Sequence, residues 1–427
     1  MEIGLPILLI KLANKMELQR IKIMKKLKNN DKLHVLIMPS WYKSPDEPVL
    51  GTFFEEQARA LQNEGFEVGI IYPEYMPPGI LFRKDNREFN DFYMDKGIPT
   101  FHIRATAGIP KLRRLSYRYF SKSVRNVFDN YVETFGKPDI IHAHSVFHAG
   151  IAGFHIAKTN KIPFVITEHL TAYLMGYINN RIDIEMAREI FQYADSSIIV
   201  SNNFRKDLEK QIGLEPNTFK VIHNLVNDLF FRSYTPKKYT PGETFNFFTN
   251  SFLLPRKNIG KIIQAIKILT DKKYEVSLTI GGDGPEEEKL HNLVNELDLK
   301  KQIRFTGKLW REEVKQELDK CHSFVLASQY ETFGVVLIES LACGRPVICT
   351  NSGGPLDFVH PEQGIIVEEH TAESLASGME KIMTGYNDYD QQAMINYCRE
   401  RFNEQKIAGE IINLYRGVLN GRLALTS

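Results

Sequence analysis

Two glutamates, Glu331 and Glu339, stand eight residues apart in a segment whose composition suits ligand binding. The apolar run Phe324–Ser328 precedes Glu331 and predicts a strand that ends just before it. In a parallel α/β sheet, ligands bind outside the carboxyl ends of the strands, so we expect Glu331 at the mouth of a cleft. Glu339 follows on the predicted helix, where its carboxylate can accept hydrogen bonds from hydroxyl groups of the same ligand.

Between the two glutamates lies a predicted anion site at the start of a helix. Gly334 lets the backbone approach a ligand closely, and the amides of Val335 and Val336 have no carbonyl partner within the helix that they begin. Free amides at a helix start bind phosphate. A phosphate-binding helix start between two carboxylates that accept hydroxyl hydrogen bonds therefore predicts a sugar nucleotide as the ligand.

The elements that must position these residues follow a regular alternation. Short β-branched runs alternate with helical stretches, which predicts βαβ units and parallel sheets. Residues 228–244 break the alternation with two prolines and a glycine and are interpreted as a linker. The alternation resumes at Phe245–Thr249. The predicted fold class is α/β, with two Rossmann-like, doubly wound parallel-sheet domains that face a cleft.

The predicted domain bounds follow from these breaks. They are a basic extension at 1–30, a first Rossmann-like domain at 31–228, a linker at 229–244, a second Rossmann-like domain at 245–404, and a helix at 405–427 that returns toward the first domain. The extension lacks the features of a secretory signal. It is interpreted either as a leader outside the native protein, which would then start at Met16 or Met24, or as a disordered arm, and an interfacial membrane anchor is a further alternative.

The bulk composition is that of an ordinary globular protein of two or three domains, with 427 residues, 43% hydrophobic and 25% charged residues and a net charge of +2. No apolar run reaches the length of about 18 residues that a membrane span needs. Four cysteines show neither metal spacing nor a disulfide framework, so buried thiols in a reducing, cytoplasmic compartment are expected. We expect no metal site and no nucleic-acid partner.

Residues 104–125 concentrate positive charge, with seven lysines and arginines and no acidic residue. Leu112, Leu115, Tyr119 and Phe120 are interleaved with these charges. This pattern is typical of a basic amphipathic helix on an anionic membrane surface, which would place the protein at the inner face of a membrane. The alternative is a solvated helix whose apolar stripe packs on its own domain.

Nine short motifs occur in one order along the two predicted domains. They are Pro39–Tyr42, Gly51–Phe53, Asp139–His144, Thr167–His169, Pro255–Asn258, Gly281–Pro285, Glu331–Glu339, Ala342–Val347 and Asn351–Pro355. Together they resemble glycosyltransferase family 4, the retaining enzymes of the GT-B fold, from about Leu33 to Leu419. One motif alone would be a weak signal, whereas this many in order form a strong one.

The resemblance implies roles for the residues of the second domain. It implies that Glu331 binds hydroxyl groups of the donor sugar, that Glu339 binds the ribose and that Lys257 binds the diphosphate. The charge of Lys257 would offset the negative charge that develops on the leaving group. The expected donor-binding residues of this domain are Lys257, Arg256, Gly282, Glu331, Phe333, Gly334, Val335, Val336 and Glu339.

One position departs from the family pattern. The family has a Gly-Arg pair shortly before the lysine, and aligned on Lys257 these places hold Ser251 and Phe252. One of two cationic contacts to the diphosphate is therefore in question, and Arg256 is the candidate substitute. Gly281–Pro285 fails as a dinucleotide fingerprint, because position 287 holds a glutamate where a glycine is needed. That failure argues against a nicotinamide-dependent dehydrogenase.

In the first domain, His169 follows the strand Phe164–Thr167, and the resemblance places it near the donor sugar. It is the third predicted catalytic residue, with Glu331 and Lys257; a structural histidine is the alternative. Gly51 would let the first loop approach the donor phosphate or the acceptor, and a helix-entry turn is its alternative. Neither predicted domain offers an obvious carboxylate nucleophile paired with an acid, and Glu168, beside His169, is the candidate for that role.

The expected activity is transfer of a sugar, with retention, from a nucleotide-sugar, UDP- or GDP-linked, to a saccharide or lipid-linked acceptor. The resemblance favours a mechanism in which the acceptor hydroxyl attacks the sugar carbon on the same face from which the phosphate leaves. The leaving phosphate would accept the proton of that hydroxyl. The expected setting is cell-surface polysaccharide synthesis. The alternative is a non-catalytic binding subunit that keeps the fold, a reading supported by Phe252 alone.

Overall fold

The computed structural model describes residues 32–43, 49–76, 89–106, 112–232 and 234–426, so the predicted extension at 1–30 lies outside the described residues. The chain forms two compact units. The first comprises Met1–Ile199, Leu208–Val221 and Ala408–Ser427, and the second comprises Val200–Asp207 and Ile222–Ile407. Residues 229–244, predicted as a linker, belong to the second unit.

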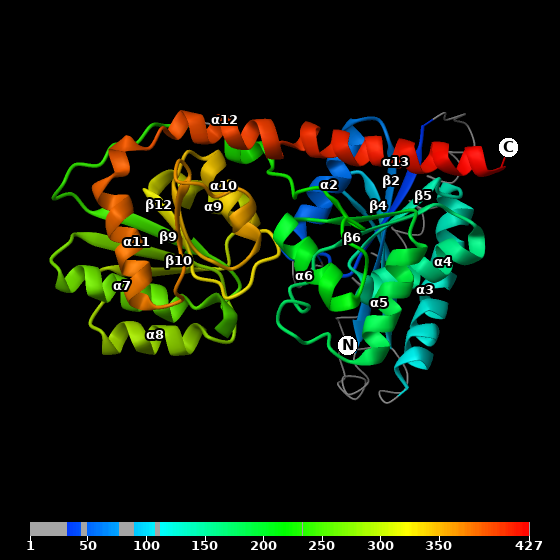
Figure 1. Ribbon diagram of the computed structural model, residues 1–427, viewed down its shortest axis with the longest axis horizontal. Helices are drawn as coiled ribbons and strands as arrows, with labels where there is room; N and C mark the ends of the chain where they lie inside the picture. The colour runs from blue at the N-terminus through cyan, green and yellow to red at the C-terminus, as the bar shows by residue number, and fades with distance from the viewer. Residues whose placement is uncertain (1–31, 44–48, 77–88, 107–111, 233, 427) are drawn as a thin grey trace, which may run out of the picture. The chain divides into compact units, whose positions relative to one another are not determined.

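The first unit is built on an eight-stranded sheet in the order β3-β4-β2-β1-β5-β6-β7-β8 (Figure 1). Neighbouring strands are parallel except β3 and β4, which pair antiparallel at one edge. The strands are β1 (His34–Pro39), β2 (Glu67–Met76), β3 (Phe89–Asp95), β4 (Ile98–Thr106), β5 (Ile140–His144), β6 (Phe164–Glu168), β7 (Ser196–Ile199) and β8 (Lys220–Val221). Every residue of β1, β5 and β6 is buried, because these strands lie inside the sheet.

The β3–β4 hairpin corrects the prediction of one basic helix over residues 104–125. Arg104 lies on β4, and its Nε donates a hydrogen bond to Oε2 of Glu74 at 2.9 Å. The helix begins only at Arg113, and Lys111 lies outside the described residues. β4 is held by a parallel ladder with β2 that extends to the pair Met76 and Thr106, so residues up to 106 are strand.

Helices cover this sheet, and the last helix of the chain contributes to the same unit (Figure 1). They are α2 (Thr52–Asn63), α3 (Arg113–Phe135), α4 (Ile151–Asn160), α5 (Arg181–Tyr193), α6 (Asn202–Ile212), which continues from the second unit, and α13 (Glu404–Thr426). Within the described ranges, no helix is long and apolar enough to cross a membrane.

The second unit contains a six-stranded parallel sheet in the order β11-β10-β9-β12-β13-β14 (Figure 1). The strands are β9 (Phe245–Asn250), β10 (Val276–Gly281), β11 (Ile303–Gly307), β12 (Ser323–Leu326), β13 (Val347–Thr350) and β14 (Gly364–Val367). The chain winds outward from β9 to β11, returns to β12 and winds outward on the other side. Ligands bind at such a reversal, outside the carboxyl ends of the central strands β9 and β12.

The crossovers of this unit are helical. They use α7 (Ile259–Asp271), α8 (Glu287–Glu296), α9 (Arg311–Lys320) and α10 (Val335–Ala342), and α11 (Ala372–Thr384) and α12 (Gln391–Phe402) follow the last strand. Right-handed crossovers place α7 and α8 on one face of the sheet and α9 and α10 on the other. The core between α7, α11 and the sheet is apolar and includes Ile263, Leu278, Ile348 and Met379.

A buried arginine joins several segments of the second unit. Arg345 has no exposed surface. Its Nε donates to the carbonyl of Leu318 at 3.0 Å, and its Nη2 donates to the carbonyls of Thr235 and Asp319, each at 3.3 Å. Two of these carbonyls belong to the last turn of α9, where helical carbonyls lack partners. Arg345 stands in one of the family-like motifs, and the structure gives it a packing role.

Candidate active site

Two loops at the carboxyl ends of β12 and β13 form one side of the candidate site. The amide of Glu331 donates to the carbonyl of Ser352 at 2.8 Å, and the amide of Gly354 donates to the carbonyl of Glu331 at 2.8 Å. Gly354 has no room for a side chain, because a Cβ there would lie 2.5 Å from the backbone of Phe333. The backbone of Glu331 is therefore fixed at the strand ends.

The side chain of Glu331 forms an ion pair with Lys257, with 2.5 Å between Oε1 and Nζ. Both side chains are largely buried, at 13% and 14% exposure. Burial acts to raise the pKa of Glu331, but the charges of Lys257 and Arg256 outweigh it and lower that pKa. The carboxylate therefore stays ionised and can accept hydrogen bonds only.

Lys257 and Arg256 come from the short 3-10 helix η4 (Pro255–Lys257), which follows β9. The carbonyl of Arg256 accepts a hydrogen bond from the amide of Gln329 at 2.9 Å, which ties η4 to the loop after β12. The structure thus brings Lys257 and Glu331, 74 residues apart in the chain, to the sheet reversal where the fold places a ligand.

Glu339 lies on α10 and is 1% exposed. Its Oε1 accepts a hydrogen bond from Nη1 of Arg311, and the Arg311 guanidinium lies 4.8 Å from the ring centre of Phe230. Burial raises the pKa of Glu339, while the charge of Arg311 acts in the opposite direction. Sequence reasoning missed Arg311; its only signal is its place at the first residue of a helix that follows a strand end.

The start of α10 has the expected backbone. Gly334 adopts φ of 100°, which favours glycine, and α10 begins directly after it at Val335. The side chain of Phe333 is 1% exposed and packs against Phe358 and Phe402, so any ligand contact of Phe333 must come from its backbone.

The position that departs from the family pattern faces solvent. Phe252 is 54% exposed, so the place of the family arginine carries an aromatic ring and no charge. The neighbouring Gly282 adopts φ of 109°, and a Cβ there would lie 1.9 Å from the carbonyl oxygen of Ser251. Gly282 is thus required for the close packing of two loops, whatever it contributes to a ligand.

In the first unit, His169 follows β6 and lies in an aromatic and histidine cluster. Its Nε2 is 3.0 Å from Nδ1 of His144, and its ring centre lies 5.3 Å from that of Phe54. His142, on the same strand as His144, contacts Tyr415 of α13, with 2.6 Å between Nδ1 and the phenol oxygen. The residues of this cluster are almost completely buried.

Glu168 has a structural role. It is completely buried, and its Oε1 accepts hydrogen bonds from the amides of His169 and Leu170, each at 2.8 Å. Its Oε2 accepts from the amide of Val146 at 2.9 Å. A carboxylate whose oxygens bind three backbone amides holds the loops after β5 and β6 together, which leaves it poorly suited to attack a sugar carbon.

Gly51 lies in the first unit at the start of α2. It adopts φ of 68°, and a Cβ there would lie 2.9 Å from the carbonyl oxygen of Trp41. This close approach explains why position 51 holds a glycine, which forms the turn that leads into α2.

The buried histidines make the first unit sensitive to acid. Burial lowers the pKa of both His142 and His169 from 6.5 to about 3. Above pH 6.5 both residues are neutral in the folded and unfolded states. Below it the unfolded chain binds protons that the folded chain does not, so stability falls by about 1.4 kcal/mol per pH unit per histidine.

We therefore expect urea unfolding at pH 5 to show markedly lower stability than at pH 7. His142→Gln should remove about 2 kcal/mol of that difference, because one titrating group is gone between pH 6.5 and 5. Equal pH dependence in the variant and the wild type would contradict the assignment.

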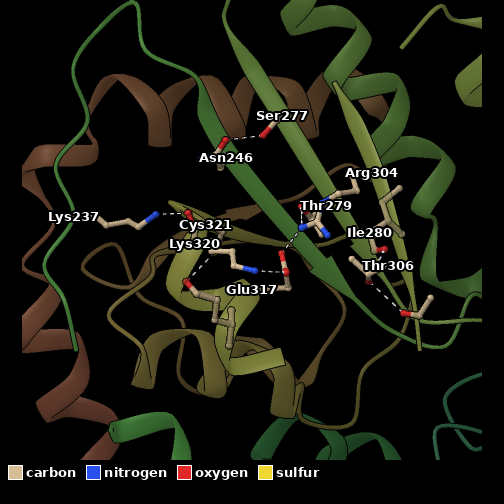
Figure 2. Close-up of polar contacts among 12 residues, drawn as sticks. Lys237, Asn246, Ser277, Thr279, Ile280, Arg304, Thr306, Glu317, Lys320 and Cys321 are labelled. Atoms are coloured by element: carbon tan, nitrogen blue, oxygen red, sulfur yellow. Dashed lines mark hydrogen bonds and ion pairs between the residues drawn. The ribbon is translucent and has the colours of Figure 1, made fainter. Parts of the chain in front are cut away.

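A second polar cluster in the second unit lies at the other end of the sheet. Figure 2 shows Glu317 of α9 between Arg304 and Lys320, with Lys320 Nζ 2.9 Å from Glu317 Oε1. Asn246 and Ser277, each the second residue of its strand, are joined by a hydrogen bond of 2.7 Å. Arg304 and Lys320 neutralise the charge of Glu317. Because the cluster surrounds the amino ends of the strands, it is separate from the candidate site at their carboxyl ends.

Two Rossmann-like parallel-sheet units, with polar residues at the carboxyl ends of their strands, define the GT-B class of α/β protein. Sucrose-phosphate synthase from Thermosynechococcus elongatus has this fold, with a TM-score of 0.71, 19% identity and coverage of 91% of this chain and 100% of that chain. The structure of HepE from Anabaena in complex with UDP and glucose matches with a TM-score of 0.65, 18% identity and coverage of 90% and 100%.

Sequence comparison identifies the family. Residues 50–228 match the family model "Glycosyltransferase Family 4", and residues 234–401 match "Glycosyl transferases group 1". The chain therefore belongs to the group 1 and family 4 glycosyltransferases. A putative teichuronic acid biosynthesis glycosyltransferase from Bacillus subtilis is 24% identical over 358 residues, which cover 81% of this chain and 88% of that protein.

Proposed function

We propose that this protein is a retaining glycosyltransferase that transfers a sugar from a UDP- or GDP-linked donor to a saccharide or lipid-linked acceptor, in cell-surface polysaccharide synthesis. The observation that carries the proposal is the ion pair of Lys257 and Glu331 at the sheet reversal, beside the start of α10. The similarity to a putative teichuronic acid biosynthesis enzyme supports the setting, and the likeness to HepE, solved with UDP and glucose, supports the donor.

Each charged residue has a role in this proposal. Lys257 binds the diphosphate and stabilises the charge that develops when the sugar leaves. Glu331 accepts hydrogen bonds from sugar hydroxyl groups, and Glu339 accepts them from the ribose. The charge of Arg311 opposes the rise in the pKa of Glu339 that burial causes. The buried, fully bonded state of Glu168 favours attack by the acceptor itself over a covalent intermediate on that carboxylate.

Thermal unfolding in the presence of UDP, GDP, ADP and their common sugar conjugates tests the donor site. A ligand at a hundredfold excess over its dissociation constant adds about 2.7 kcal/mol to the stability of the folded state. We expect one nucleotide series to raise the midpoint of the wild type and not that of Lys257→Met. Lys267→Met is the matched control, because Lys267 lies on the surface of α7 and pairs with Asp271.

The absence of a shift for every nucleotide would overturn the donor assignment. It would favour the alternative of a non-catalytic subunit, which the exposed Phe252 at the place of the family arginine also supports.

The exposed end of α3 supports a membrane-proximal acceptor. Leu112, Leu115 and Tyr119 are exposed, at 47%, 56% and 52%. Arg118 and Lys122 on the same helix are exposed as well. Phe120, by contrast, is completely buried and anchors the helix to its own unit. We propose that this apolar and basic surface contacts anionic lipid headgroups at the inner face of the membrane.

A flotation assay with anionic liposomes checks this surface. Each basic side chain near such a membrane contributes about 1 kcal/mol, so reversing Arg114, Arg118 and Lys122 to glutamate should weaken binding roughly 100-fold or more. Arg113 is left unchanged because it pairs with the buried Asp183. Substitution of the exposed Lys206 and Lys210 on α6 by glutamate, which reverses their charges, is the control. Equal flotation of both variants would mean that α3 is an ordinary solvated helix.

A further inference from the structure

The contact between His144 and His169 sets where the protons of these two rings lie. A single hydrogen bond of 3.0 Å joins Nδ1 of His144 to Nε2 of His169. Burial holds the pKa of His144 well below its ordinary value and lowers that of His169 to about 3, so both rings are neutral and each carries one proton. Only two arrangements of these protons preserve the hydrogen bond.

In the first arrangement, His144 donates from Nδ1, and His169 accepts at Nε2 and carries its own proton on Nδ1. In the second, His169 donates from Nε2, so the proton of His144 must lie on its Nε2. The two arrangements thus differ in whether Nε2 of His144 is a bare lone pair or an N–H group.

The surroundings of His144 Nε2 decide between them. This atom is buried and has no hydrogen-bond partner among the described residues. The adjacent ring of His142, 4.3 Å away between centres, cannot supply one, because its nitrogens contact Tyr415 at 2.6 Å and Thr167 at 2.7 Å. A buried N–H group without a partner is rarer in proteins than an acceptor without one. The first arrangement is therefore favoured.

We propose that His144 is a positioning residue that donates from Nδ1 to Nε2 of His169 and so places the proton of His169 on Nδ1. His169 then presents an N–H group as a hydrogen-bond donor. It cannot act as a general base, because Nδ1 is already protonated and Nε2 is engaged. If the proposed function holds, the ligand of this N–H is an oxygen of the sugar substrates.

The contacts of His169 are consistent with an N–H group kept for a ligand. No hydrogen-bond partner for Nδ1 of His169 occurs in the parts of the chain that the structure describes. The ring is held from the sides by aromatic contacts, with its centre 5.3 Å from Phe54 and 5.4 Å from Phe53. The contact with His144 thus fixes both the ring and its tautomer.

Nitrogen NMR of the histidine side chains in the ligand-free protein tests the tautomers directly. We expect protonated Nδ1 and unprotonated Nε2 for both His144 and His169. A protonated Nε2 on His169 would overturn the proposal. The variants His144→Asn and His144→Leu separate the hydrogen bond from packing, since asparagine keeps an N–H donor and leucine does not.

In His144→Asn, His169 should keep its proton on Nδ1, whereas in His144→Leu the preference should be lost. The tautomer of His155, a half-buried histidine on α4, is the internal control and should not change. An unchanged His169 tautomer in the folded leucine variant would show that His144 does not set it. Thermal unfolding identifies a variant that fails to fold, and the wild-type spectrum alone still decides the tautomer.

A kinetic measurement connects the tautomer of His169 to the proposed function. The assignment of a sugar oxygen as the ligand of His169 rests on that function. With the nucleotide-sugar that stabilises the wild type, His144→Leu should lower kcat roughly tenfold, and His144→Asn should recover most of it. Affinity for the nucleoside diphosphate should be unchanged in both. If no nucleotide binds the wild type, the proposed function fails while the NMR result still judges the tautomer. Equal kcat in wild type and leucine variant would contradict the role of His144.

Discussion

Replacing Lys257 with methionine is expected to lower kcat by roughly 100- to 1000-fold, the usual effect of removing one group that stabilises charge in a transition state. Lys257 is the candidate for that role because its Nζ lies 2.5 Å from Oε1 of Glu331, the carboxylate that we propose binds the donor sugar. The measurement is turnover of the nucleotide-sugar that stabilises the wild type, with Lys267→Met as the surface control. Near-normal turnover would remove Lys257 from the reaction.

Because Lys257 also neutralises a largely buried carboxylate, its loss is expected to affect stability as well. Removing one partner of a buried ion pair typically costs about 3–5 kcal/mol, whereas replacing both by apolar residues of similar volume is close to neutral. The double variant Lys257→Met and Glu331→Met should therefore recover the stability that the single variant loses, and it should remain inactive. Activity that returned with stability would mean that the pair is structural only.

The pH dependence gives an independent check on this pair. Lys257 holds the pKa of Glu331 below its ordinary value of 4.5, against the effect of burial. A carboxyl with a lowered pKa contributes stability above its ordinary pKa and loses it as the pH falls. The stability difference between wild type and Lys257→Met should thus be largest near neutral pH and shrink as Glu331 becomes protonated.

The second large effect is expected from Arg345→Met. The variant removes donors from the carbonyls of Leu318, Thr235 and Asp319, all joined to a side chain with no exposed surface. Each hydrogen bond to a charged group contributes up to about 1.5–3 kcal/mol to stability. Because three carbonyls lose such a donor, we expect the free energy of unfolding to fall by about 3 kcal/mol or more. Thermal unfolding should show a midpoint lower by about 6–12 °C.

Two further variants define the cause of that loss. Arg345→Lys should recover only part of the stability, because one ammonium cannot reproduce the planar fork that serves three carbonyls. Arg401→Met, at an exposed position near the end of α12, should change little. Equal midpoints for Arg345→Met and Arg401→Met would show that the hydrogen bonds of Arg345 contribute little to the fold.

Local patterns predicted the strands that lie inside the sheets. The apolar runs Phe324–Ser328 and Phe164–Thr167 are predicted as strands, and the structure has β12 and β6 there. Buried parallel strands read as continuous apolar runs, so they are visible in a sequence. The edge hairpin of β3 and β4 was missed because its first strand, Phe89–Asp95, mixes polar and aromatic residues. Edge strands are exposed on one side and carry no such signal.

The sequence by itself determined the fold class, the order of the two Rossmann-like units and the place of Glu331 and Gly334 between a strand and a helix, because these depend on residues close together in the chain. Only the tertiary structure decided which charges meet. The partners of Glu331 and Glu339 are 74 and 28 residues away, and the partner of His142 is 273 residues away. Such pairs depend on strand order and helix packing, which no local period encodes, and they determine the ionisation state and hydrogen bonding of each site residue.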